Sequence, residues 1–478
     1  MQDAVPTAAE VRGLGTTGGG FAVVLSLLTT LALTQFLWSR SLGVVPQAFN
    51  WLDDLLVVGL GFLALTRRPR PVPLSHLWAG ALAVFLVVAL TGTLANEVPA
   101  GRALLGLRGV LLYLPLYYAV VVANIDRGGV RAVLAVLVGL ALVQFPVQVV
   151  EFLWGIVRFG LDFGSLADFA VGTFGTGLAN ALGLFMVPFV ALGVGMWSVG
   201  AGARWLLAAV AFGASLVLSS GRAAALLAPV GIVVILGMTH GWRWLASSRQ
   251  LGRLALIAAV ILVAGEAYYR STSGAGLLAR LSPQVLLQEQ LTYSSESSAR
   301  LAYYPVTWEV LASEAASPWI GLGPGNYASG AGYLTNAPGL NLIRDVFGQW
   351  ETDRETALNS QLLTSLGEFG ILGVGSFFLM LALLLRRTLA VHAREGDPRS
   401  RVVLGAIAIG QGVFMIGTLV EPVWEDQVIA LPFWLVTALV TTMVQQPADT
   451  GRVLSAPPLA STPTPGVPVV GNDQSEPR

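Results

Sequence analysis

Long apolar runs separated by short polar segments make up most of the chain. Runs of about 15 to 25 apolar residues are long enough for an α-helix to cross a bilayer core of about 30 Å. We expect about twelve such helices, at roughly 21–38, 51–66, 76–94, 104–123, 132–153, 175–198, 205–219, 223–240, 254–269, 358–385, 402–420 and 427–445. The run at 51–66 is the weakest, because it is short and begins with Asp53 and Asp54. The pattern predicts an all-α polytopic membrane protein.

Two segments depart from this pattern. Residues 270–357 are polar, and an unstructured loop of that length is unusual, so we expect a folded cap. Within it, the apolar spacing over 298–315 predicts an amphipathic helix at the membrane surface, kinked by Pro305. The predicted organisation is an N-terminal segment (1–20), nine helices (21–269), the cap (270–357), three helices (358–446) and a disordered tail rich in Pro, Ser and Thr (447–478).

Composition supports the membrane assignment. The chain is 55% hydrophobic and 11% charged, whereas soluble domains carry about 25% charged residues. A formal net charge of zero gives no electrostatic basis for nucleic-acid binding, and the lack of cysteine excludes disulfides and thiolate chemistry.

The arginines orient the bundle. They follow the second, fourth, sixth, eighth and tenth expected spans, and cytoplasmic loops are the ones enriched in basic residues. This places both termini in the cytoplasm and the cap on the external side of the membrane. The three histidines, His76, His240 and His392, then lie on the cytoplasmic side.

Two external motifs could bind a ligand. Ser219-Ser220-Gly221-Arg222 joins two spans, and the Arg222 guanidinium offers a planar set of donors that suits phosphate oxygens; the alternative is an arginine that only reaches the interface. In the cap, Arg300 precedes Gly321-Leu322-Gly323-Pro324-Gly325, whose glycines let the backbone approach a ligand.

A third motif begins at Asn359 and enters the tenth span. Gly367, Gly370 and Gly373 share one helix face, which favours close helix packing. Glu368 is ionisable within a span and is therefore a functional candidate.

Carboxylates also gather at the external side. They are either general bases toward a sugar hydroxyl or simply solvated, and they comprise Glu351, Asp353, Glu355, Glu421, Glu425 and Asp426.

Taken in order, these motifs resemble those of the O-antigen ligase / O-antigen polymerase family, over roughly residues 170 to 385. Gly172-Thr173-Phe174-Gly175 with Asn180, the Ser219–Arg222 element, Arg300 with the glycine-rich turn, and Asn359 through Gly373 carry the resemblance. Where ligases of this family have a histidine, this chain has Asn359, and the external loop has no histidine. This difference favours a polymerase, or a ligase-like enzyme with another base.

The resemblance implies a GT-C-like bundle and a glycosyltransferase that needs no metal or other cofactor. The enzyme would move an oligosaccharide from undecaprenyl pyrophosphate to the hydroxyl of a glycan or lipid acceptor, in O-antigen, exopolysaccharide or other cell-envelope polysaccharide biosynthesis. Arg222 and Arg300 would hold the pyrophosphate, Asn359 would orient the acceptor, and Glu355 or Asp353 would take the proton. Further substrate contacts are expected from Ser220, Tyr304, Gly321, Gly323, Gly325 and Glu368.

Two other kinds of protein fit part of the pattern. A transporter or flippase would share the many spans, but the chain shows no internal repeat and few ionisable residues at mid-membrane depth. A structural membrane subunit would leave the two external arginines, Arg222 and Arg300, without a role.

Overall fold

The protein is described by a computed structural model. It covers residues 15–41, 45–46, 51–66, 75–159, 170–175, 178–219, 221–242, 303–313, 317–341 and 360–445, together with Val263, Glu266 and Arg270. Within these residues the secondary structure is helical and contains no strand, which confirms the predicted all-α class.

The helices of the first half are α2 (Gly15–Phe36), η1 (Leu37–Ser41), α3 (Leu52–Thr66), α4 (His76–Ala95), α5 (Ala100–Leu111), α6 (Leu114–Ala123), α7 (Arg127–Phe159), η3 (Gly172–Phe174), α9 (Ala179–Ser198), α10 (Ala203–Leu218) and α11 (Arg222–His240). The second half contains α16 (Tyr303–Ser313), α17 (Ser317–Ile320), α18 (Gly330–Leu334), α20 (Gln361–Arg394), α21 (Pro398–Gly417) and α22 (Gln427–Gln445).

Eight of the described helices are long and apolar enough to cross a membrane, and the count becomes nine if the bent pair α5–α6 forms one span. They make the chain a multi-pass membrane protein. Helices α3 and α10 occupy two further expected spans, but with 15 and 16 residues they are shorter than these eight helices. The expected span at 254–269 lies almost wholly outside the described residues. The total of twelve therefore stays a prediction.

The fourth expected span, 104–123, differs from a single helix. The structure has two helices there, α5 and α6, bent by 49° at a break of two residues, Leu112 and Tyr113. Pro115 lies in the first turn of α6. A proline has no N–H to donate to the preceding turn but fits the start of a helix, so a new helix begins here.

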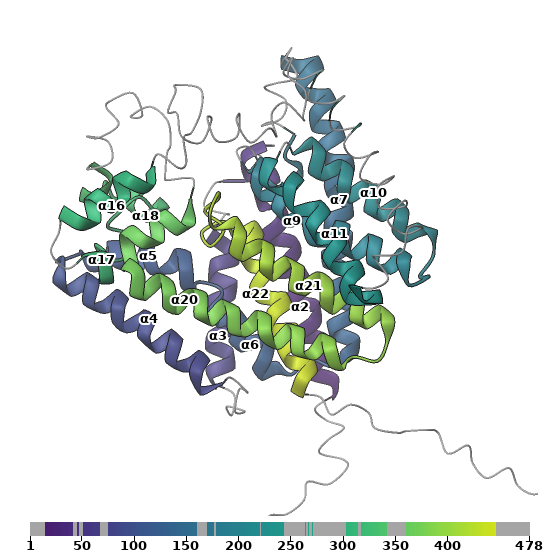
Figure 1. The fold of residues 1–478 in the computed structure, drawn as a ribbon, viewed down its shortest axis with the longest axis horizontal. Coiled ribbons are helices and arrows are strands. Elements are labelled where there is room, and N and C mark those ends of the chain that lie inside the picture. Colours follow the sequence, from purple (N-terminus) through teal and green to yellow (C-terminus); the bar gives the residue numbers. More distant parts are fainter. Residues whose placement is uncertain are drawn as a thin grey trace, which may run out of the picture.

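Two helices extend further than the hydropathy pattern predicted. Helix α7 has 33 residues, about 50 Å at 1.5 Å per residue, and this exceeds an apolar core of about 30 Å. Its end therefore projects beyond the rest of the bundle in Figure 1. Helix α20 has 34 residues and is kinked at Gly370, whose backbone angles are φ 61° and ψ −173°.

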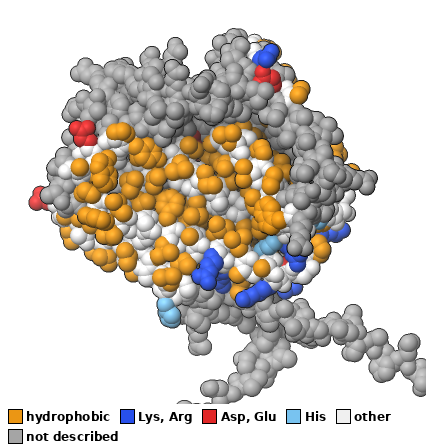
Figure 2. All heavy atoms as spheres, in the orientation of Figure 1, with side chains coloured by type: hydrophobic (Ala, Val, Ile, Leu, Met, Phe, Trp, Pro, Cys, Tyr) orange, Lys and Arg blue, Asp and Glu red, His pale blue; other side chains and the backbone are white. Residues whose placement is uncertain are grey.

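The centre of the bundle is formed by α9 and α22, of whose span residues 83% are buried in each case, compared with 28% for α7. Small residues allow the close approach that helix packing in lipid requires. A Cβ atom at Gly193 of α9 would lie 2.8 Å from Ala209 of α10, and one at Gly183 would lie 2.9 Å from Ala224 of α11. Figure 2 shows the broad apolar surface outside this core, with basic side chains at its lower edge.

The described part of the cap consists of α16, α17, α18 and the segment that joins the last two. These helices lie together at one end of the bundle, over α4 and the beginning of α20 (Figure 1); we call this the cap end. Helix α16 accounts for residues 303–313 of the predicted 298–315, and the rest of that range lies outside the described residues. Helix α16 is amphipathic, with Trp308 55% exposed and Leu311 1% exposed.

Candidate functional site

The residues Gly321–Tyr327, which we call the glycine loop, lie directly against α20. The backbone N–H groups of Leu322 and Gly323 donate to the carbonyl oxygens of Gly367 and Glu368, at 2.8 and 3.0 Å. This contact occurs next to the kink at Gly370. The loop therefore adds hydrogen bonds to an irregular part of α20 that would be costly to leave unpaired in a membrane.

Glycine is required on both sides of this contact. Gly321 has φ +71°, and a Cβ atom there would overlap the backbone of Glu368 and Phe369. A Cβ at Gly370 would overlap the backbone between Trp319 and Ile320. The close approach predicted for these glycines occurs between two segments of the chain itself.

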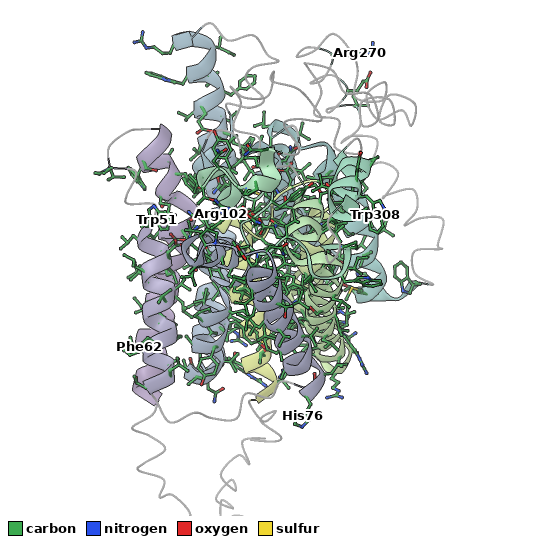
Figure 3. All side chains as sticks on the ribbon, turned by 90° about the vertical axis from the view of Figure 1, so that its left-hand side faces the viewer. Trp51, Phe62, His76, Arg102, Arg270 and Trp308 are labelled. Atoms are coloured by element: carbon green, nitrogen blue, oxygen red, sulfur yellow. The ribbon has the colours of Figure 1, made fainter. Side chains whose placement is uncertain are left out.

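The opposite side of the glycine loop rests on α4 and α5. Asn96 Nδ2 donates to the Gly321 carbonyl at 3.2 Å. The Arg102 guanidinium donates to Asn326 Oδ1 at 2.8 Å and to the hydroxyl and carbonyl oxygens of Thr335 at 3.0 and 3.3 Å. Figure 3 shows Arg102 in the upper half of the molecule, whereas Phe62 projects from α3 away from the bundle. The glycine loop is thus held between α20 and the α4–α5 corner.

A small apolar cluster connects this loop to α16. Its buried members are Val310, Leu322, Tyr327, Ala328, Leu340 and Leu363, with Tyr304 packed against them. The Tyr327 hydroxyl donates to Thr307 Oγ1 at 2.8 Å, and burial raises the pKa of Tyr327. Tyr304 also interacts with the side chain of Ser360, the residue that caps α20.

Glu368 lies beneath the glycine loop. Its side chain is only 2% exposed and interacts with the Ser329 side chain and the backbone N–H groups of Gly325 and Tyr327. Its Oε1 atom has no hydrogen-bond partner among the described residues. Glu368 thus helps to hold the loop, and its expected contact with substrate stays a prediction.

A second carboxylate, Glu425, lies beside it in the segment between α21 and α22. One Glu425 oxygen accepts from the Gly330 N–H at 2.8 Å and the other from Gln361 Nε2 at 3.4 Å. Burial raises the pKa of Glu425. Glu425 and Glu368 also interact electrostatically. This carboxylate, already a candidate base from the sequence, is placed at the cap end with an increased affinity for a proton.

The aspartates that made the span at 51–66 doubtful have partners in α5 and its surroundings. Arg108 Nε donates to Asp54 at 2.8 Å, and the guanidinium carbon lies 4.5 Å from the centre of the Trp51 ring. Asp53 accepts from Gln35 and Tyr113, both at 3.2 Å. The sequence offered a signal for this group, because Arg108 is ionisable and falls within an expected span.

The segment around Gly172 and Thr173 is fixed by a buried polar network. Gln144 Nε2 donates to Thr173 Oγ1 at 2.7 Å, and the Thr173 N–H donates back to Gln144 Oε1 at 2.8 Å. The Gly172 N–H donates to Glu151 at 2.6 Å. Each polar group pairs with another inside the bundle, as burial in an apolar environment requires.

The structure brings five of the predicted site residues together: Gly321, Gly323, Gly325, Tyr304 and Glu368. Arg222 begins α11 and follows Gly221, whose Cα lies 3.4 Å from an ideal Cβ position at Gly183. The Arg222 side chain is outside the described atoms. Ser220, Arg300, Asp353, Glu355 and Asn359 also lie outside the described residues. Within the described residues, no three His, Asp or Glu side chains form a metal-binding group.

The contact at Gly321 gives a direct test. Gly321→Ala combines a left-handed backbone, which disfavours a non-glycine residue by on the order of 1–3 kcal/mol, with overlap against α20. We expect a lower thermal unfolding midpoint of the detergent-solubilised protein, followed by tryptophan fluorescence. Gly375→Ala is the control, because no atom lies within 4 Å of its Cβ position. Equal midpoints for the two variants would contradict the proposed packing.

Residues 207–378 match the family model of the O-antigen ligase domain, and no curated protein matches the chain. The matched segment contains the Ser219–Arg222 element, the glycine loop and the kinked start of α20. It confirms the resemblance to the O-antigen ligase/polymerase family that the motifs carry, over these residues.

Proposed function

We propose that this protein transfers an undecaprenyl-pyrophosphate-linked oligosaccharide to an acceptor hydroxyl at the periplasmic face of the inner membrane, during synthesis of O-antigen or another cell-surface polysaccharide. The observation that carries the proposal is the O-antigen ligase match at residues 207–378. The packing of the glycine loop on α20 supports it, because both segments lie within the match and meet at the cap end of the bundle.

In the proposed reaction, the acceptor oxygen attacks the anomeric carbon of the donor sugar. The bond from that carbon to the pyrophosphate oxygen breaks, and undecaprenyl pyrophosphate leaves with the bonding electrons. The acceptor proton passes to a base. Glu355 and Asp353 are candidates from the sequence, and Glu425 is a further candidate among the described carboxylates at the cap end. Asn359 would orient the acceptor.

Arg222 and Arg300 would bind the pyrophosphate and stabilise the charge that develops as it leaves. The position of Arg222 supports this role. It is the first residue of α11, a helix of 19 residues, and the N–H groups at a helix N-terminus favour an anion in the same way as a guanidinium does.

The polyprenyl tail would occupy an apolar cavity of about 490 Å³ between α7, α9, α21 and α22. At the cap end the cavity is lined by Val423, in the segment before α22. It also reaches Arg131 and Trp205, which lie near the first residues of α7 and α10. Its walls are almost entirely apolar, as an isoprenoid chain requires.

The transfer proposal is tested by glycan profiles of a deletion strain that carries the wild-type gene, Arg222→Ala or Arg300→Ala at matched expression. Long surface polysaccharide should be lost in the deletion and restored by the wild type but by neither variant. Arg204→Ala, an exposed arginine in the first turn of α10, is the control and should complement.

The residual products identify the reaction. Single repeats would indicate a polymerase, and long chains that remain on the carrier would indicate a ligase. An unchanged profile in the deletion, or full complementation by both arginine variants, would contradict the proposal and favour a transporter.

The cavity is tested by filling it. Gly139 lines the cavity, and its Cβ position is free of neighbours within 4 Å, so Gly139→Leu should place a side chain in the path of the tail without displacing another helix. We expect the affinity for undecaprenyl pyrophosphate in nanodiscs to fall about tenfold, equivalent to about 1.4 kcal/mol. Gly375→Leu, which is exposed and equally free of neighbours, should bind as the wild type does. Unchanged affinity in Gly139→Leu would place the tail elsewhere.

A further inference from the structure

Arg102 makes a set of contacts that its position in the sequence does not suggest. All three guanidinium nitrogens donate hydrogen bonds, Nε and Nη2 to Thr335 and Nη1 to Asn326. Thr335 directly follows α18, and Asn326 belongs to the glycine loop. Among the described residues no carboxylate forms an ion pair with Arg102. Its fork therefore joins two points of the cap to α5.

The Asn326 side chain connects Arg102 to the backbone of the glycine loop. Its Oδ1 atom accepts from Arg102, and its Nδ2 atom donates to the Leu322 carbonyl at 3.0 Å. Leu322 in turn donates through its own N–H to α20. Asn326 is 8% exposed, so water does not readily replace these bonds.

Tyr327 continues the connection to α16. It is the residue after Asn326, it is fully buried, and its hydroxyl bonds to Thr307 in α16. The same ring packs over Gly367 of α20, where a Cβ atom would overlap it. In sequence, α16 begins three residues after Arg300, a proposed pyrophosphate ligand.

We propose that Arg102 is a positioning residue of the transfer reaction: it fixes the glycine loop and, through Asn326, Tyr327 and Thr307, the orientation of α16. The proposal rests on the proposed glycosyl transfer for its functional consequence. It assigns a role to α5, which lies outside the matched residues 207–378. A rigid arrangement matters because a displacement of about 1 Å in a catalytic group can reduce a rate by about 100-fold.

The proposal requires the planar guanidinium of Arg102 and not only its positive charge, and this requirement can be tested. A lysine keeps the positive charge of Arg102 but cannot supply three donors in a fixed planar fork. If Arg102 acts by position, Arg102→Lys should resemble Arg102→Ala. If it acts only by attracting the anionic donor, Arg102→Lys should retain the wild-type behaviour.

The experiment measures the mobility of α16 directly. The chain has no cysteine, so a nitroxide label on Trp308→Cys, an exposed position of α16, reports on this helix alone in the full-length protein. We expect Arg102→Lys to increase the mobility of the label. Tyr327→Phe, which removes only the hydroxyl bond to Thr307, should do the same, and the double variant should add little further.

The matched control is Arg401→Lys. Arg401 also donates through two guanidinium nitrogens, to the Glu395 carbonyl at 3.2 and 2.8 Å, but between α20 and α21, away from the cap. This variant should leave the label unchanged. A label equally immobile in Arg102→Lys and in the wild type would overturn the positioning role.

Glycosyl transfer by the same variants, without the label, tests the functional consequence of the proposal. We expect kcat to fall about 10- to 100-fold in Arg102→Lys, with a smaller change in the affinity for undecaprenyl pyrophosphate. Full activity in Arg102→Lys combined with loss in Arg102→Ala would show that charge alone matters and would overturn the proposal. If the wild type itself transfers no glycan, the proposed function fails, whereas the label still decides whether Arg102 positions α16.

Discussion

The arrangement of the cap end depends on two backbone hydrogen bonds, from Leu322 and Gly323 to the carbonyls of Gly367 and Glu368. Gly370 interrupts the helical geometry of α20 just beyond these carbonyls. In an apolar environment an unpaired backbone group is costly, so an irregular helix needs donors from elsewhere. The glycine loop supplies them, and the loop can approach only because Gly321 and Gly370 have no side chains. The kink and the loop therefore require each other, and this mutual requirement attaches the cap to the membrane bundle.

The N-terminal half of the chain completes this attachment. The α4–α5 corner holds the other side of the glycine loop through Asn96 and Arg102. The break after α5 makes this possible, since it lets α5 lie at an angle of 49° to α6 and present its arginines at the cap end. Arg108, on the same helix, fixes the start of α3 through Asp54. Helix α5 thus joins the cap to the bundle's peripheral helices, although the family match begins only at residue 207.

Hydropathy predicted the all-helical membrane class and the approximate place of most described helices, because burial in lipid requires long apolar runs whatever their neighbours. It could not predict the break at Leu112–Tyr113 from apolarity alone, although Pro115 marked it. The motifs placed the glycine loop and the start of α20 in one functional region, and the structure shows them in contact. Their chemistry was less predictable: the glycines contact chain backbone, and Glu368 lies buried beneath the loop. Arg102 escaped notice because its partners, Asn326 and Thr335, are more than two hundred residues away in the sequence.

The central claim is that this protein forms a glycosidic bond and breaks the bond between the donor sugar and its pyrophosphate carrier. The most direct test combines the purified protein in nanodiscs with the lipid extract of its own deletion strain, which should contain the accumulated native donor and acceptor. We predict that glycan leaves the carrier, that undecaprenyl pyrophosphate appears in equal amount, and that Arg222→Ala abolishes both changes. If the donor stays intact while the same protein moves it from one leaflet of a vesicle to the other, the protein is a transporter and the claim is wrong.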